Sequence, residues 1–295
     1  MGWLWVAVTL VAAAAQTARN ATQSGLTARI GTLGATQVRF VYGLPFALVF
    51  LAGVLAVQGG PLPVPGARSL GFAVMGALAQ IGATALMLAA MQARGLAVAT
   101  AWIKTEPVLI ALLGAAVLED TLTWPMIGAV ALATSGVLLM ARPAGSPWAL
   151  APAVLGLSAA ALFGLAAIGF RGAILALPEG GFVLRASVIL CLSLALQVAL
   201  LGVWMALRAP GVMAASLSLW RPSLAAGFLG AFASQFWFLG FALTSAANVR
   251  TLALVEVVFA TVVGWLAFGQ RLDRRQAAGA ALVCLGVGAL LRLSA

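Results

Sequence analysis

The sequence predicts an all-α polytopic membrane protein. Of its 295 residues, 64% are hydrophobic and only 7% are charged, whereas a soluble domain typically carries about 25% charged residues. Apolar runs of about twenty residues, the length that crosses a bilayer, recur along the whole chain. A soluble protein of this composition would expose extensive apolar surface and aggregate, so the composition disfavours the soluble class.

Ten of these apolar runs are expected to be transmembrane helices. The connections between them are short, contain Pro and Gly, and leave no room for a soluble domain. One connection, 211–222, is amphipathic enough to form a short interfacial segment. The expected helices cover residues 3–22, 35–57, 70–92, 96–118, 124–141, 148–170, 182–207, 223–243, 247–268 and 275–293.

The two halves of the chain resemble each other. A shift of 150 positions places Glu106 on Glu256, and this match is informative because the chain has only six acidic residues. With five helices per half, the second half would insert upside down relative to the first, as in many secondary transporters. The sequence therefore predicts ten transmembrane helices arranged as two inverted five-helix repeats, residues 1–146 and 147–295, around a central cavity.

Short motifs in both halves carry a family resemblance. The first half contains KTEPVL at 104–109, LEDTL at 118–122 and GVLL at 136–139, and the second half contains EVV at 256–258, FGQRL at 268–272 and GV at 286–287. Together with the VRF sequence at 38–40, these motifs resemble EamA-type transporters of the drug/metabolite transporter (DMT) superfamily. The resemblance implies ten helices, a cavity between the halves, and export of small metabolites, amino acids or drugs.

Two departures from the family pattern limit what the resemblance implies. Gln270 stands where the family usually has an acidic residue, and the first helix contains AQTARN at 15–20 in place of a Trp-Gly-Ser type of start. In relatives, the first helix contributes to the substrate cavity. The resemblance therefore does not identify the substrate of this protein.

Glu106 and Glu256 are the strongest candidates for function, because an ionisable group within the bilayer costs a few kcal/mol on insertion scales. Burial in a low dielectric favours the neutral form of a carboxyl group, so either residue could carry a proton. The alternative is that each carboxylate forms a permanent ion pair with Arg39, Lys104 or Arg19 and thereby fixes the packing of the helices.

Lys104 lies two residues before Glu106, about 200° away around a regular helix. Both side chains could reach one cavity only if the helix is distorted, and Pro107 favours a bend because it removes a backbone hydrogen bond. Trp102 lies four residues before Glu106 and would share its helix face. We therefore expect Trp102 to line any cavity that Glu106 lines.

Further polar residues interrupt the apolar helices. Four of them, Gln16, Arg19, Asn20 and Gln23, form one stripe on the first helix. This stripe must avoid lipid and could line the cavity or bond to a neighbouring helix. The complete set of candidate substrate-binding residues is Gln16, Arg19, Asn20, Gln80, Trp102, Lys104, Glu106, Gln235, Asn248 and Glu256, and the candidates for proton coupling are Glu106 and Glu256.

Basic residues outnumber acidic ones among the buried candidates. Arg19, Arg39, Lys104 and, at the start of its helix, Arg250 stand against two Glu, which favours a substrate with a carboxylate or phosphate group. We expect an exporter of small metabolites, such as amino acids or related carboxylates, that works by alternating access. The alternatives are a cationic drug efflux pump and a non-transporting membrane protein, either lipid-handling or a scaffold.

The sequence gives little sign of catalysis. The chain has no His, its two Cys are isolated within apolar segments, and no Gly-rich phosphate loop occurs. We therefore expect no enzymatic activity, no metal and no cofactor. The expected partners are a small-molecule substrate, protons and membrane lipid, with no nucleic acid because the basic residues are scattered singly. For the oligomeric state, the sequence allows a monomer or a homodimer.

The distribution of Arg conflicts with the family resemblance over orientation. When the connections between the expected helices are numbered from the N-terminus, the odd-numbered ones hold eight Arg. The even-numbered connections and the two termini together hold five. The more basic side normally faces the cytoplasm, which would place both termini outside, whereas relatives have both termini inside. We follow the resemblance and expect a bacterial plasma (inner) membrane protein with cytoplasmic termini.

Overall fold

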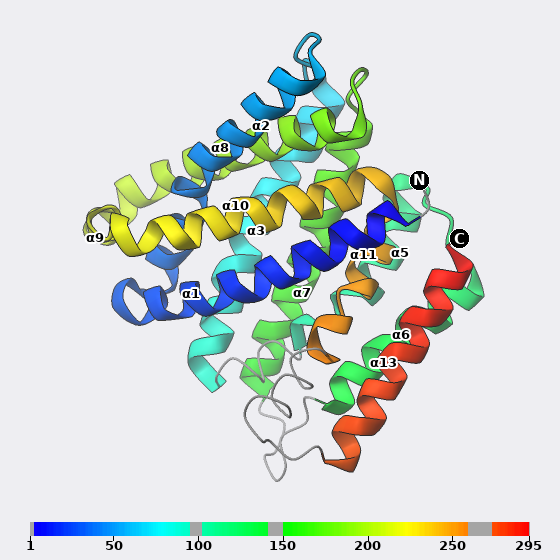
Figure 1. Ribbon diagram of the computed structural model, residues 1–295. Helices are drawn as coiled ribbons and strands as arrows, with labels where there is room; N and C mark the ends of the chain where they lie inside the picture. The colour runs from blue at the N-terminus through cyan, green and yellow to red at the C-terminus, as the bar shows by residue number, and fades with distance from the viewer. Residues whose placement is uncertain (1–2, 95–101, 141–149, 259–272, 295) are drawn as a thin grey trace.

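The computed structural model describes residues 3–94, 102–140, 150–258 and 273–294, and every regular element in these ranges is a helix (Figure 1). The helices are α1 (Leu4–Val41), α2 (Gly43–Gln58), α3 (Ala67–Arg94), α5 (Glu106–Leu118), α6 (Trp124–Met140), α7 (Leu150–Leu175), α8 (Phe182–Arg208), α9 (Pro210–Ser218), α10 (Trp220–Leu243), α11 (Ala246–Leu252) and α13 (Arg274–Leu293).

Most expected helices are present close to their expected positions. The ranges 70–92, 124–141, 182–207, 223–243 and 275–293 correspond to α3, α6, α8, α10 and α13. The range 148–170 corresponds to α7, which continues to Leu175. The expected interfacial segment contains the short helix α9. Parts of the expected helices 96–118 and 247–268 lie outside the described residues.

The first two expected helices are separated by a sharp turn at Gly31. This residue has φ 69° and ψ 177°, so α1 consists of two helical segments, and its positive φ is a conformation that Gly adopts readily. The side-chain amide of Gln23 donates to the carbonyl of Ala35 over 2.9 Å. In a straight helix, twelve residues would span about 18 Å. The chain therefore reverses between these two residues and continues into α2.

The helices pack in pairs that combine the two ends of the sequence. α1 lies along α10, α3 along α7, and α6 along α13, while α2 contacts α8 and α5 contacts α11 (Figure 1). The pair formed by α6 and α13 meets through glycines. A Cβ atom on Gly286 would lie 2.5 Å from the backbone nitrogen of Ala133 and 2.7 Å from the carbonyl oxygen of Ala129. Such close backbone approach is common between membrane helices.

The described residues contain six helices that are long and apolar enough to cross a membrane. Two shorter apolar helices are Glu106–Leu118 and Trp124–Met140. Large apolar side chains cover much of the outer surface, and Val57 and Trp124 are 87% and 85% exposed. An apolar exterior of this kind suits contact with lipid. The structure is thus that of an all-α integral membrane protein.

The packing of α6 on α13 gives a test of the fold. We expect Gly286→Ala to lower the free energy of unfolding by about 1–3 kcal/mol, because the new methyl group meets backbone atoms that cannot rotate away. Gly288→Ala is the matched control, because nothing lies within 4 Å of its Cβ position. Unfolding in detergent, followed by circular dichroism, measures both variants. Equal stability of the two variants would contradict the packing.

Candidate functional site

A cavity of about 70 Å³ lies between α1, α3, α5, α7, α8, α10 and the segment that contains α11. This volume gives room for a few water molecules. The polar and charged side chains that line it are Gln16, Arg19, Asn20, Arg39, Gln80, Lys104, Glu106, Ser193, Gln197, Ser234, Arg250 and Glu256.

Glu256 is held by two partners from the first half of the chain. Its Oε2 lies 3.0 Å from Nζ of Lys104 in an ion pair. Its Oε1 accepts a hydrogen bond of 2.7 Å from the hydroxyl of Thr17 on α1. Only 13% of the Lys104 side chain and 15% of the Glu256 side chain are exposed. Both carboxylate oxygens therefore have a polar partner within the protein.

Glu106 is paired more loosely. Its Oε1 lies 3.3 Å from Nε of Arg250, yet neither of these two atoms makes a hydrogen bond. The guanidinium of Arg250 lies 4.5 Å from the ring centroid of Trp237, a cation–π contact. The indole of Trp237 in turn donates to Oε1 of Gln16 over 2.9 Å. This chain of contacts joins α5, α11, α10 and α1.

Arg19 and Arg39 contact neutral groups. Arg19 donates to Oδ1 of its neighbour Asn20 over 2.7 Å, and its Nη1 has no hydrogen-bond partner. Arg39 donates to the hydroxyl of Thr84 over 3.0 Å. Turning the amide of Gln80 lets its oxygen accept from both terminal nitrogens of Arg39, each at 3.0 Å. Neither arginine forms an ion pair within the described residues.

The backbone is broken beside each cavity glutamate. Lys104 and Thr105 form a turn, and α5 begins at Glu106. Ala253 and Leu254 form a similar turn between α11 and the helical residues that include Glu256. Broken helices at membrane depth occur where backbone and polar groups line a cavity. The distortion expected around Pro107 is confirmed, and it brings both Lys104 and Glu106 to the cavity.

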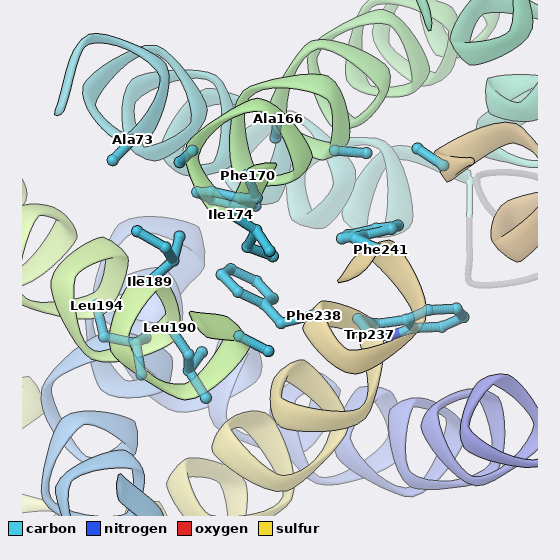
Figure 2. Close-up of a cluster of buried hydrophobic side chains, with 14 of the residues drawn as sticks. Ala73, Ala166, Phe170, Ile174, Ile189, Leu190, Leu194, Trp237, Phe238 and Phe241 are labelled. Atoms are coloured by element: carbon cyan, nitrogen blue, oxygen red, sulfur yellow. The ribbon is translucent and has the colours of Figure 1, made fainter. Parts of the chain in front are cut away.

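One side of the cavity is apolar. Phe170 of α7 and Phe238 of α10 point toward one another, with ring centroids 4.8 Å apart (Figure 2). Leu190 and Leu194 of α8 lie on the other side of Phe238 in the same view, and all four side chains line the cavity. The site thus combines charged groups from α1, α5 and α11 with an apolar wall.

Seven of the ten candidate substrate-binding residues line the cavity. They are Gln16, Arg19, Asn20, Gln80, Lys104, Glu106 and Glu256. Glu256 forms an ion pair, which was the alternative to proton binding. Its partner, Lys104, is one of the three basic residues that the sequence suggested. Glu106 pairs instead with Arg250, which the sequence had placed at the start of its helix.

Trp102 does not belong to the lining of the cavity, contrary to the expectation from its spacing to Glu106. Its Cβ packs where α7 has Gly156, with no space for a further methyl group. The reason is the turn at Lys104 and Thr105. The four-residue spacing predicts a shared face only in an unbroken helix.

Gln235, Asn248 and Gln23 also point elsewhere. The amide of Gln235 donates to Ser187 on α8 over 2.9 Å, because the cavity face of α10 is formed by residues 234, 237, 238 and 241. Asn248 bonds to Thr244 over 3.0 Å at the start of α11. Gln23 bonds across the turn at Gly31. These three polar residues stabilise helix packing and helix ends.

Several lining residues were missed by the sequence reasoning. Ser193 and Gln197 on α8 are four residues apart and share a face, as do Ser234, Phe238 and Phe241 on α10. This periodicity could have identified the cavity faces of both helices. Trp237 lies between Ser234 and Phe238 in the sequence of α10. Nothing in the sequence distinguished it as a cavity residue, because Trp is also common at membrane interfaces.

Comparisons with known proteins find a similar fold among solved structures. The chain matches no family model and no curated protein. Among solved structures, 24 chains match. One, a crystal structure described simply as that of a protein, has a TM-score of 0.68 and 18% sequence identity, over 99% of this chain and 95% of that chain. At this identity, the similarity concerns the fold alone.

The ion pair between Lys104 and Glu256 is testable by a double-mutant cycle. We expect Lys104→Met and Glu256→Gln each to lower the free energy of unfolding by about 1–3 kcal/mol, because each leaves a partly buried charge without its counter-charge. The double variant should lose less than the sum, with a coupling energy of about 1–3 kcal/mol.

Unfolding in detergent measures this cycle. Exposed charges provide its control, because Arg208→Met and Glu179→Gln remove residues that form no ion pair in the described structure. Their effects should add. If the effects of Lys104→Met and Glu256→Gln also add, the ion pair contributes nothing and the geometry described here is wrong.

Proposed function

We propose that this protein is a secondary membrane transporter that exports small metabolites, such as amino acids or related carboxylates, by alternating access. The observation that carries the proposal is the small cavity lined by charged side chains among apolar helices. Ionisable residues within a membrane are costly, and they commonly mark the path of a solute or ion.

The pairing of helices supports ten crossings in two inverted repeats of five. Matching the halves in order pairs α1, α2, α3, α5 and α6 with α7, α8, α10, α11 and α13. Under this exchange, the contact between α1 and α10 becomes the contact between α7 and α3, and both are present. The contacts of α2 with α8, α5 with α11, and α6 with α13 exchange into themselves. An approximate twofold relation between the halves accounts for this pattern.

The ion pairs suggest how the halves are coupled. Lys104 and Glu106 belong to the first half, and their partners Glu256 and Arg250 belong to the second. Each half thus supplies one acid and one base to a reciprocal arrangement. In alternating access, one half rocks against the other around the site. We propose that these pairs hold the described conformation and rearrange when the halves move.

The charge of the cavity favours an anionic group on the substrate. Four cationic side chains and two acidic ones line it, so a carboxylate gains more there than a cation does. The EamA-like motifs imply export of small metabolites, amino acids or drugs, which includes anionic solutes. We propose that the protein lies in the bacterial plasma membrane with both termini cytoplasmic. Reporter fusions at the C-terminus test this orientation.

Glu106 is the better candidate for proton coupling. Its Oε1 has no hydrogen bond, whereas both oxygens of Glu256 are engaged by Lys104 and Thr17. Protonation of Glu106 would break one loose ion pair with Arg250 and no hydrogen bond at Oε1. Protonation of Glu256 would disrupt a fully bonded carboxylate. The geometry therefore favours Glu106 as the group that binds and releases the proton.

Reconstitution in liposomes tests the proposed function. Purified protein should transport members of a panel of labelled amino acids and organic anions, and protein-free liposomes should not. Transport of quaternary cations without any anion or zwitterion would instead indicate a cationic drug pump. Failure to move any solute of the panel, with the protein correctly inserted, would indicate a non-transporting membrane protein.

Glu106→Gln tests the proton coupling. The amide keeps the size of the side chain and cannot carry a proton, so we expect accumulation driven by a pH gradient to fall at least tenfold while solute exchange is retained. Glu179→Gln removes an exposed carboxylate that forms no ion pair in the described structure, so it is the matched control and should keep its response to the gradient. An unchanged pH dependence in Glu106→Gln would refute this role.

A further inference from the structure

Two cavity arginines form no ion pair within the described residues. Lys104 and Arg250 are paired with Glu256 and Glu106, which leaves Arg19 and Arg39 with neutral partners. Arg19 is 3% exposed and Arg39 is 8% exposed. An arginine keeps its proton in proteins, so both groups stay charged. Burying two unneutralised guanidinium groups is costly unless something else supplies negative charge.

The protein has no other acidic side chain to offer. All six acidic residues lie in the described part of the chain. Two form the cavity ion pairs, and Asp120 is paired with Arg171 at 2.9 Å. The remaining three, Glu119, Glu179 and Asp273, are exposed. The cavity therefore keeps an excess of two positive charges over its acidic side chains.

The two unpaired arginines lie close together. Their stems pass over Gly230 on α10, where a Cβ atom would lie 3.5 Å from Cγ of Arg39 and 3.7 Å from Cδ of Arg19. Nη1 of Arg19 is buried and has no hydrogen-bond partner. A guanidinium group suits planar, bidentate contacts with carboxylate or phosphate oxygens.

We propose that Arg19 and Arg39 form an anion subsite, and that the transported substrate is a compact organic dianion, a short dicarboxylate or a phosphate monoester. This inference rests on the proposed function and sharpens it. A dianion matches the excess of two charges, whereas an amino acid zwitterion or a monocarboxylate leaves at least one charge uncompensated. The small volume of the cavity favours a compact molecule, and Phe170 and Phe238 offer an apolar surface to its carbon skeleton.

Ligand binding to the purified wild-type protein provides the first test. The melting temperature is measured against the concentration of succinate and of butyrate, which have the same chain length and differ in charge, at constant ionic strength. Glycerol 3-phosphate and glycerate form a second pair that represents phosphate monoesters. Chloride replaces each anion as the salt control. A ligand that binds the folded state raises the melting temperature, and the dependence of that rise on ligand concentration gives the affinity.

We expect one of the two dianions to bind at least tenfold more tightly than its monoanionic counterpart. The pair that shows the preference distinguishes a dicarboxylate from a phosphate monoester. Equal binding of dianion and monoanion in both pairs, or the same stabilisation by chloride alone, would overturn the proposal.

Variants provide the second test. In Arg19→Gln and in Arg39→Gln, affinity for the dianion should fall at least tenfold, while affinity for the monoanion changes less than threefold. Arg208→Gln removes an exposed charge at the end of α8 and should change neither. Arg19→Lys keeps the charge without the planar fork and should restore part of the dianion preference. A loss of both affinities to the same extent would assign the arginines a structural role and contradict the subsite.

Flux in liposomes separates this inference from the proposed function. Dianion-selective binding without movement of any solute would support the subsite and contradict the transporter. Transport of zwitterions and monoanions at the rate of dianions would support the transporter and contradict the subsite.

Discussion

Six of the described ionisable side chains meet in one cavity among helices whose outer surfaces are apolar, and each charge there costs a few kcal/mol unless a counter-charge is close. Two ion pairs, Lys104 with Glu256 and Arg250 with Glu106, meet this requirement for four of the six. Both pairs join the first half of the chain to the second. The same pairing that makes the buried charges tolerable therefore also connects the halves.

The breaks in the helices follow from this constraint. In a regular helix, Lys104 and Glu106 would point in nearly opposite directions, so one of them would face lipid or pack against apolar side chains. The turn at Lys104 and Thr105 lets both reach the cavity. A second turn at Ala253 and Leu254 precedes Glu256. The helices are thus interrupted where charged groups converge on the cavity. By contrast, α6 and α13, which pack on each other through glycines, are continuous helices.

Much of the fold could be predicted from the sequence, because apolar runs bounded by Pro and Gly define membrane helices directly. The cavity was predicted less completely. Glu106 and Glu256 were found because acidic residues are rare here, but the position of Trp102 depended on an unbroken helix. Gln235 and Asn248 were chosen because they are polar, and polarity alone does not say which neighbour a helix face meets. The partner of Glu106 could not be predicted, since Arg250 is distant in sequence and is brought close by the packing of α11 on α5.

Thiol labelling tests alternating access to the cavity most directly. Ser193 lines the cavity on α8 and is 1% exposed, so Ser193→Cys places a small reactive group there once Cys191 and Cys284 are replaced by Ser. A membrane-impermeant thiol reagent is applied to one face of the membrane at a time. With alternating access, we expect labelling from both faces, with the two rates changed in opposite directions when a transported solute is added to one side. Labelling from one face only, at a rate that no solute changes, would contradict it.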